Sequence, residues 1–311
     1  MADKRDFKII VIGGGPAGLT AALYTARAGM DTLLVEREML GGQIANVDKL
    51  ENYPGFPDGI SGFDLAQLMQ QQAEKYGVQI MFTEATGLEL AGQNRLVKTA
   101  EGDFVAKAVI LTGAAKRRKL GVPGESEFTG RGVSYCATCD GPIFRDKIVA
   151  ISGGGNAAIT EALHLTHFAS KVIVIHRRDT LRATAILQER AFAEPKISFV
   201  WDTSIDKIEG EDFLKRLLLK NLKTGASSTL DVEGLFVSIG FEPDTAYLKG
   251  ILPLDTEGHI ITNSEMETAV PGIFVAGDTR SKMARQVVTA AGDGATAAIS
   301  AERYISQIAV K

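Results

Sequence analysis

The stretch FKIIVIGGGPAGLTAALYTARAGMDTLLVER, residues 7–37, has the order of a βαβ unit: an apolar run, three glycines, an alanine-rich segment and a second apolar run. Within it, Gly13, Gly15 and Gly18 form the spacing G-x-G-x-x-G. The first glycine permits a tight turn, the second lets a pyrophosphate approach the backbone, and the third keeps helix and strand close together. The stretch therefore predicts a Rossmann-like dinucleotide-binding domain.

A second unit of the same kind occurs later in the chain. The stretch KIVAISGGGNAAITEALHLTHFASKVIVIHR, residues 147–177, aligns with the first without a gap at an offset of 140 residues. Its Gly153, Gly155 and Ala158 form the variant G-x-G-x-x-A. The sequence therefore predicts an α/β protein with two Rossmann-like dinucleotide-binding domains.

The second strands of the two units end in different residues, Glu36 in the first and His176 in the second. A carboxylate at this position accepts hydrogen bonds from ribose hydroxyls and would repel a 2′-phosphate. After His176 come Arg177, Arg178 and Arg182, whose guanidiniums match phosphate oxygens, so the second unit favours NADPH over NADH. A solvated basic loop is the alternative interpretation of these arginines. The residues expected to bind NADPH are Gly153, Gly155, Asn156, Ala157, Ala158, His176, Arg177, Arg178 and Arg182.

The order of the strands predicts that one domain is inserted into the other. Apolar strands ending in glycine, residues 108–113 and 234–240, each close the region that follows a nucleotide unit, and we expect tethers near residues 115 and 242. A further strand at residues 272–276 precedes Gly277 and Asp278, and a helix is expected over about residues 284–308. Asp278 could serve a flavin or simply open a turn. The predicted domains are residues 1–115 with 247–311, which bind FAD, and residues 116–246, which bind NADPH.

Composition narrows the class of protein. The 311 residues contain 34 Lys and Arg against 38 Asp and Glu, a net charge of -4, which argues against nucleic acid as a partner. No apolar run is long enough to span a bilayer, and the start of the chain lacks the features of a secretion signal. With only two cysteines, a disulfide scaffold is excluded. We expect a cytoplasmic protein that does not contact membranes.

The two cysteines, Cys136 and Cys139, form a C-x-x-C motif. A structural zinc site needs four ligands, and neither another cysteine pair nor a matching histidine pair exists, so no metal is expected. A C-x-x-C near a helix start can hold one thiol as a thiolate at neutral pH, which thiol exchange requires. The next residue, Asp140, could move a proton to or from a cysteine, or only open the following turn.

Two dinucleotide sites and one dithiol suggest a path for electrons. A nicotinamide donates hydride, whereas reduction of a disulfide needs a nucleophilic carrier, and a flavin can accept the first and perform the second. The sequence therefore predicts an oxidoreductase that uses both cofactors and its own cysteine pair.

Six motifs resemble those of one known family. The chain is similar over nearly its whole length to the bacterial-type, low-molecular-weight thioredoxin reductases, a class of pyridine nucleotide-disulfide oxidoreductase. The motifs, in chain order, are GGGPAGL at 13–19, GGQ at 41–43, ENYPGFP at 51–57, CATCDG at 136–141, HRRD at 176–179 and GIFVAGD at 272–278.

The resemblance implies roles for named residues. Cys139 is the sulfur nearer the flavin, Cys136 attacks the protein substrate, and Asp140 is the acid. The resemblance also implies a homodimer and a rotation of the NADPH domain that presents the cysteines and the nicotinamide to the flavin in turn. The residues expected to bind FAD are Gly13, Gly15, Ala17, Gly18, Glu36, Gly41, Gly42, Gln43, Asn52, Gly277, Asp278, Arg285, Gln286 and Val287.

The function predicted from these features is NADPH-dependent reduction of the disulfide of thioredoxin, or of a thioredoxin-like protein, through FAD and Cys136 and Cys139. Two alternatives stay open at this point. One is a flavin-dependent dithiol oxidase on the same scaffold, and the other is a nucleotide-sensing binding protein with an inert disulfide.

Overall fold

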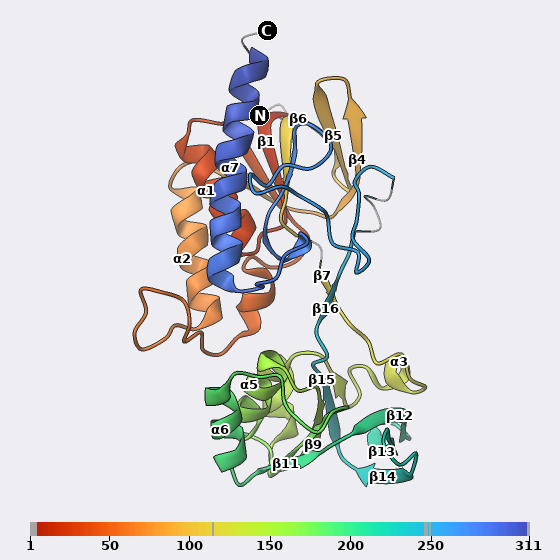
Figure 1. Ribbon diagram of the computed structural model, residues 1–311. Helices are drawn as coiled ribbons and strands as arrows, with labels where there is room; N and C mark the ends of the chain where they lie inside the picture. The colour runs from red at the N-terminus through yellow and green to blue at the C-terminus, as the bar shows by residue number, and fades with distance from the viewer. Residues whose placement is uncertain (1–4, 114, 246–247, 249, 310–311) are drawn as a thin grey trace. The chain divides into compact units, whose positions relative to one another are not determined.

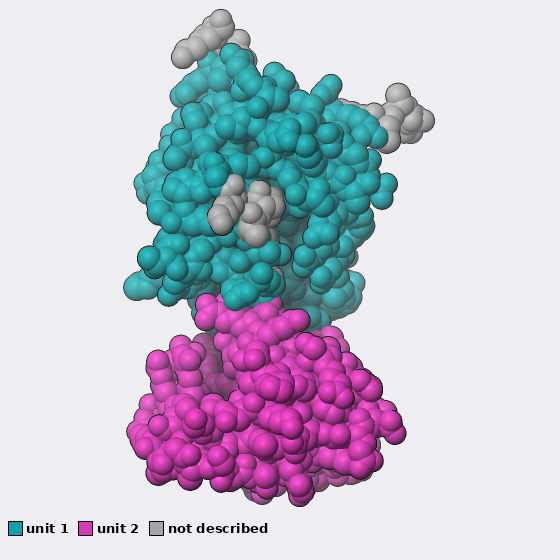
Figure 2. Space-filling view, turned by 90° about the vertical axis from the view of Figure 1, so that its right-hand side faces the viewer, with its two compact units in different colours: residues 1–116, 242–311 teal, residues 117–241 magenta. Residues whose placement is uncertain are grey.

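The chain divides into two compact units, shown in different colours in Figure 2. The computed structural model describes residues 5–113, 115–245, 248 and 250–309. Unit 1 comprises residues 1–116 and 242–311, and unit 2 comprises residues 117–241. The expected domain boundary at residues 246 and 247 lies outside the described residues. One unit is thus assembled from both ends of the chain, and the other is continuous.

Unit 1 is an α/β unit that begins with the first glycine-rich βαβ stretch (Figure 1). Pro16 opens its first helix, where a missing N–H costs nothing, and the alanine-rich sequence continues it. Its elements are β1 (Asp6–Ile12), α1 (Pro16–Arg27), β2 (Thr32–Glu36), η1 (Gly42–Asn46), α2 (Gly62–Glu74), β3 (Gln79–Phe82), β4 (Ala85–Ala91), β5 (Asn94–Thr99), β6 (Gly102–Leu111), β17 (Ile273–Val275), η4 (Gly277–Thr279) and α7 (Val287–Ala309).

The sheet of unit 1 has the order β3-β2-β1-β6-β5-β4, and β17 also pairs with β6. Strands β1, β2, β3, β6 and β17 pair in parallel, whereas β4 and β5 form an antiparallel hairpin against β6. Figure 1 shows α1, α2 and α7 together on one side of this sheet. The carboxyl ends of β1, β2, β6 and β17 therefore lie along one sheet edge, where α/β proteins bind ligands.

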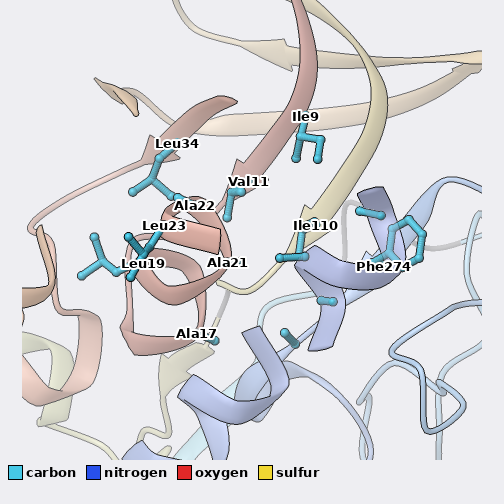
Figure 3. Close-up of a cluster of buried hydrophobic side chains, with 14 of the residues drawn as sticks. Ile9, Val11, Ala17, Leu19, Ala21, Ala22, Leu23, Leu34, Ile110 and Phe274 are labelled. Atoms are coloured by element: carbon cyan, nitrogen blue, oxygen red, sulfur yellow. The ribbon is translucent and has the colours of Figure 1, made fainter. Parts of the chain in front are cut away.

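From Ile9 to Ile12 both faces of β1 are buried, which explains why this part of the strand is an uninterrupted apolar run. Ile9 and Val11 pack against the helices, in the cluster that Figure 3 shows with Leu19 of α1 and Phe274 of β17. Ile10 belongs to a separate cluster on the opposite face of the sheet. Burial on both sides fixes the register of β1 and so fixes the position of the glycine turn that follows it.

Unit 2 contains the second glycine-rich βαβ stretch and both cysteines. Its elements are α3 (Glu125–Phe128), β8 (Val133–Ser134), α4 (Ala137–Asp140), η2 (Gly141–Phe144), β9 (Ile148–Ser152), α5 (Asn156–Leu165), β10 (Lys171–Ile175), α6 (Ala185–Ala193), β11 (Ile197–Val200), β12 (Thr203–Gly210), β13 (Leu214–Asn221), β14 (Ser227–Asp231) and β15 (Gly234–Val237).

The main sheet of unit 2 is parallel throughout, with the order β11-β10-β9-β15-β8. A smaller antiparallel sheet is formed by β12, β13 and β14. Ile151 of β9 packs with the helices, while Ala150 packs in the cluster that includes Leu217 of the smaller sheet. Both units therefore have the predicted Rossmann-like arrangement, and the α/β fold class is confirmed.

The chain passes between the units twice, at β7 (Ala115–Arg117) and β16 (Phe241–Pro243), which pair with each other. Further along, α7 begins at Val287 and not at about residue 284. The hydroxyl of Thr289 accepts a hydrogen bond from the backbone N–H of Gln286 at 3.2 Å. This capping contact makes Gln286 the residue before the helix, so residues 284 and 285 lie outside it. Among the described residues, no helix has the length and apolar content needed to cross a bilayer.

Candidate active site

The glycine turn of unit 1 brings β1 and α1 very close together. Gly13 has φ +107°, and a Cβ on Gly18 would lie 1.8 Å from the carbonyl oxygen of Gly13. Gly15 caps α1, where no side chain satisfies the first backbone N–H groups, and a Cβ on Gly15 would have nothing within 4 Å. Free N–H groups at a helix N-terminus, facing open space, match what a pyrophosphate requires.

Two other predicted motifs converge on this turn. The backbone N–H of Gly41 donates to the carbonyl oxygen of Gly14 at 2.8 Å, and a Cβ on Gly42 would lie 3.3 Å from Cα of Gly15. A Cβ on Gly277 would lie 2.9 Å from Cβ of Ala17. The structure thus brings three distant segments of the chain together around the start of α1. Gln43 lies in η1 and is exposed.

Glu36 ends β2 beside the same turn. Its Oε2 accepts a hydrogen bond from the backbone N–H of Gly14 at 2.6 Å, and its Oε1 accepts one from the N–H of Glu38 at 2.9 Å. These bonds fix the orientation of the carboxylate, and each oxygen retains a second lone pair. The side chain can therefore still accept from a ribose hydroxyl.

The beginning of α7 supplies another group of predicted residues. Asn52 donates from Nδ2 to Oε1 of Gln286 at 2.9 Å, so the ENYPGFP motif meets the segment before α7. Arg285 lies with Nη2 2.9 Å from Nε2 of His259. Val287 is the first residue of the helix. The bond between Asn52 and Gln286 joins residues that are 234 positions apart in the chain.

Asp278 lies just after β17, within η4. Among the described residues, its buried Oδ1 has no hydrogen-bond partner, and the ammonium of Lys282 lies 3.5 Å from it. Burial raises the pKa of this carboxyl, and the charge of Lys282 opposes that effect. A buried acceptor without a donor is the feature that a hydroxyl-bearing ligand such as the ribityl chain of FAD would satisfy. The residues present in unit 1 therefore fit FAD.

The glycine turn of unit 2 repeats this geometry. Gly155 caps α5 without a side-chain cap, and a Cβ placed on it would have nothing within 4 Å. Asn156 Oδ1 accepts from the backbone N–H of Thr184 at 2.8 Å, and Arg182 N–H donates to the carbonyl oxygen of Gly154 at 2.7 Å. The turn and the arginine-bearing loop are therefore tied together. Of the other predicted residues, Ala158 is buried beneath the turn and Ala157 is exposed at the start of the helix.

His176 takes the place in unit 2 that Glu36 has in unit 1. Its buried ring lies against Gly154, where a Cβ would be 2.5 Å from the ring. Burial lowers the pKa of His176, and the positive charges of Arg182, Arg178 and Arg177 lower it further. A neutral imidazole at this position does not repel a phosphate, as a carboxylate would.

The three arginines after His176 are exposed on the loop that follows β10. Throughout residues 117–241, all of which are described, Arg177, Arg178 and Arg182 have no ion-pair partner. The neighbouring Asp179 is instead paired with Lys223 at 2.8 Å. Three unpaired guanidiniums beside a glycine turn that can hold a pyrophosphate fit the additional 2′-phosphate of NADPH.

Cys136 and Cys139 are joined by a disulfide, with their Cα atoms 5.3 Å apart. The bond lies at the short helix α4, and Sγ of Cys136 accepts from the backbone N–H of Cys139 at 3.2 Å. Cys139 is exposed and Cys136 is half-buried on the surface of unit 2. A disulfide at the surface is accessible to exchange with an external thiolate or with a reductant.

Asp140 is held beside the disulfide by a residue that sequence reasoning missed. Ser134 Oγ donates to Oδ2 of Asp140 at 2.6 Å and accepts from the backbone N–H of Cys136 at 3.0 Å. One hydroxyl therefore fixes both the carboxylate and the start of the C-x-x-C loop. The only sequence signal for Ser134 is its position two residues before the first cysteine.

A second missed contact anchors the residue that precedes Cys136. The buried carboxylate of Glu125 accepts from the hydroxyl of Tyr135 and from the backbone N–H groups of Leu120 and Gly121, each at 2.8 Å. Burial and the neighbouring carboxylate raise the pKa of Tyr135 to about 12. The phenol therefore stays protonated at neutral pH, which keeps this donor in place.

The geometry of the two units supports redox chemistry. In the part of the chain that is described, no group of three or more His, Cys, Asp or Glu side chains could hold a metal ion. Each unit has a glycine turn able to hold a dinucleotide, and unit 2 also carries the disulfide.

Comparisons with known proteins agree with this geometry. Residues 7–294 match the family model described as pyridine nucleotide-disulphide oxidoreductase. A thioredoxin reductase of Streptomyces coelicolor is 46% identical, over 99% of this chain and 96% of its own length. The crystal structure of Lactococcus lactis thioredoxin reductase, in the FR conformation, is 43% identical, covers 97% of this chain and 99% of its own, and has a TM-score of 0.95.

A more distant structure differs in its name. It is a ferredoxin-flavin thioredoxin reductase from Clostridium acetobutylicum, 26% identical over 99% of this chain and 100% of its own, with a TM-score of 0.56. The family match over most of the chain and the full-length relatives, together with the disulfide, identify an oxidoreductase. The chain belongs to the pyridine nucleotide-disulphide oxidoreductase family and, within it, to the thioredoxin reductases.

Proposed function

We propose that this protein uses NADPH to reduce the disulfide of a thioredoxin or a thioredoxin-like protein, through FAD and the Cys136–Cys139 pair. The observation that carries the proposal is the disulfide itself. It lies in the same unit as a glycine turn flanked by three arginines that have no ion-pair partner among the described residues. A binding protein has no use for an exposed disulfide beside an ordered carboxylate, whereas a reductase needs both.

Each group of residues has a part in this scheme. The turn at Gly13 and Gly15 holds the FAD pyrophosphate, Glu36 accepts from the ribose, and Asp278 accepts from the ribityl chain. In unit 2 the turn at Gly155 holds the NADPH pyrophosphate, and the arginines bind the 2′-phosphate. When bound, FAD supplies the chemistry that neither nicotinamide nor thiol has, because it accepts a hydride and reduces a disulfide.

Disulfide exchange then takes place on the cysteines of this chain. In the reduced dithiol, the thiolate of Cys136 attacks one sulfur of the partner's disulfide, and the partner's other sulfur leaves with the bonding electron pair. Cys139 next attacks Sγ of Cys136, which re-forms the internal disulfide and releases the second partner sulfur. Two electrons and two protons reach the partner. In this proposal Asp140, whose carboxylate is held by Ser134, moves a proton at the cysteine sulfurs.

The proposal includes a cytoplasmic homodimer, as the resemblance implies. The expected result of light scattering on the purified protein is a mass close to twice 33.2 kDa. A monomer that still turns over would remove the dimer from the proposal without affecting the chemistry.

The decisive experiment is steady-state reduction of a thioredoxin by the FAD-loaded protein, with NADPH as the donor. NADPH added without oxygen should bleach the flavin absorbance, and Cys136→Ser should abolish turnover while the flavin still bleaches. Thioredoxin reduction by the Cys136→Ser variant at the rate of the unmodified protein would refute the scheme.

A ferredoxin-linked reductase is the rival suggested by the Clostridium relative. The unpaired arginines favour NADPH, because an iron–sulfur protein has no 2′-phosphate for them to bind. The donors can be compared directly by supplying NADPH, NADH or a chemically reduced ferredoxin to the same preparation. If only reduced ferredoxin supports turnover, ferredoxin takes the place of NADPH as the electron donor in this proposal. The dithiol oxidase would instead form peroxide from oxygen with no nicotinamide present.

A further inference from the structure

Asp293 is a largely buried carboxylate in the second turn of α7, and it contacts the segment that follows β17 at three points. Its Oδ2 accepts from the backbone N–H of Gly277 at 3.2 Å and from Nζ of Lys282 at 2.9 Å. Its Oδ1 accepts from Nη1 of Arg280 at 3.1 Å. One side chain thus binds three residues of a six-residue segment to the helix.

The charged groups in this cluster are largely removed from solvent. The side chains of Lys282, Asp293 and Arg280 are 9%, 12% and 14% exposed. Arg280 also donates from Nε to the hydroxyl of Thr262 at 2.9 Å. Buried charges are stable only when paired, so removing Asp293 would leave two cations without their shared partner.

Lys282 lies between two carboxylates. Its Nζ is 2.9 Å from Oδ2 of Asp293 and 3.5 Å from Oδ1 of Asp278. Burial favours the neutral form of Asp278, and Lys282 is the first group that opposes this effect. Asp293 therefore acts on Asp278 in two ways: it holds the lysine that both carboxylates contact, and its own negative charge raises the pKa of Asp278.

The cluster is also adjacent to the start of α1. A Cβ on Gly294 would lie 2.2 Å from the carbonyl oxygen of Ala17, and one on Gly277 would lie 2.9 Å from Cβ of Ala17. The helix that carries Asp293 thus packs against the same turn of α1 that faces the predicted pyrophosphate. The segment tied down by Asp293 leads directly to Arg285, Gln286 and Val287.

We infer that Asp293 is a positioning residue of the flavin site, which sets the placement of Asp278 and of the segment before α7 through Lys282 and Gly277. The inference rests on the proposed FAD site in unit 1. Asp293 itself does not touch the cofactor. Its role is to fix an acceptor whose Oδ1 has no donor among the described residues.

The test measures FAD binding by the full-length apoprotein. Asp293→Asn keeps the size of the side chain and one acceptor but removes the charge that holds Lys282. FAD is titrated into the apoprotein, and quenching of flavin fluorescence gives the dissociation constant. Because a buried charge partner is lost, the expected result is an increase of about tenfold or more, with a changed flavin absorption band.

Glu125→Gln is the matched control. Glu125 is also a buried carboxylate with three donors, but it lies in unit 2. Its loss should lower the unfolding temperature and leave the FAD dissociation constant within about twofold of the unmodified value. Equal weakening of FAD binding in both variants would show that general destabilisation is the cause, and would overturn the inference.

Lys282→Met provides a second, independent variant if Asp293→Asn fails to fold. Lys282→Met should weaken FAD binding to a similar degree. In the double variant, the FAD dissociation constant should rise by less than the product of the two single increases. A folded Asp293→Asn or Lys282→Met protein that binds FAD as tightly as the unmodified chain overturns the inference. If the unmodified apoprotein does not bind FAD at all, the proposed function fails first, so the two failures are distinguishable.

Discussion

Glu36 Oε2 accepts a hydrogen bond from the backbone N–H of Gly14 at 2.6 Å, and this bond joins the end of β2 to the glycine turn after β1. At the matching position of unit 2, the ring of His176 lies against Gly154 and is followed by three arginines. The two βαβ units, which share one arrangement, therefore differ in the charge that they present to a nucleotide. In the proposed function, this difference separates the FAD site from the NADPH site.

Glu36→Gln removes the charge of the acceptor beside the first glycine turn. Because hydrogen bonds to charged groups contribute about 1.5–3 kcal/mol, we expect FAD binding to weaken by roughly tenfold or more. FAD titration of the apoprotein measures this. Glu38→Gln is the control, since the structure uses only the backbone of Glu38 in this contact. Unchanged affinity in Glu36→Gln would remove Glu36 from the site.

Replacement of Arg177, Arg178 and Arg182 by Gln should raise the KM for NADPH by about tenfold to a hundredfold and leave the KM for NADH nearly unchanged, because only NADPH carries the 2′-phosphate. The kcat at saturating NADPH should stay close to that of the unmodified protein. Arg216→Gln is the control, because it removes an exposed arginine of β13 that pairs with Asp231 of β14. A parallel increase in both KM values would indicate a solvated loop instead of a phosphate site.

Two glycine substitutions should separate packing from ligand binding. A Cβ on Gly18 would lie 1.8 Å from a backbone oxygen, so Gly18→Ala should lower stability by several kcal/mol, as severe overpacking does. A Cβ on Gly155 meets nothing within 4 Å, so Gly155→Ala should unfold normally but bind NADPH poorly. Thermal unfolding and NADPH titration together test the pair. Normal NADPH affinity in Gly155→Ala would place the pyrophosphate elsewhere.

Ser134→Ala should slow reduction of the protein disulfide, because the hydroxyl orders both Asp140 and the N–H of Cys136. We expect a loss of about threefold to tenfold, the effect of one hydrogen bond of roughly 1 kcal/mol. Asp140→Asn should lose more, since it removes the proton-transfer group itself. The measurement is a stopped-flow rate of thioredoxin reduction by the prereduced protein. If Ser134→Ala slows thioredoxin reduction more than Asp140→Asn does, Ser134 acts mainly on the C-x-x-C loop and not through Asp140.

Acidification should destabilise unit 2 through His176. Burial holds the folded-state pKa of His176 below its ordinary value of 6.5. As pH falls below 6.5, the unfolded chain takes up a proton there before the folded chain does, so the contribution of His176 to stability is lost. Urea unfolding of the unmodified protein and of His176→Gln, between about pH 7.5 and pH 5.5, tests this. Fluorescence of Trp201, the one tryptophan in the sequence, reports on unit 2. Equal pH dependence in both proteins would contradict the assignment.

Local sequence is sufficient to predict the features that depend on a short spacing between residues. The turn between β1 and α1 needs glycine at fixed positions, because a Cβ on Gly13 or Gly18 would collide with backbone, and such requirements are visible in the chain itself. The proximity of Cys136 and Cys139 likewise follows from three residues of separation. The α/β class with two Rossmann-like domains was predicted on these grounds and is confirmed.

Only the tertiary structure decided which distant side chains support those motifs. Three relationships follow no recognisable spacing: Ser134 bonded to Asp140, Glu125 bonded to Tyr135, and Asp293 linked to Asp278 through Lys282. Each depends on how helices and loops pack onto a sheet, and a buried carboxylate is stabilised only by the donors that packing places around it. The sequence by itself therefore determined where dinucleotides and a dithiol belong, because backbone sterics act locally. The tertiary structure decided what orients them, because burial and charge pairing act between segments that meet only when the chain is folded.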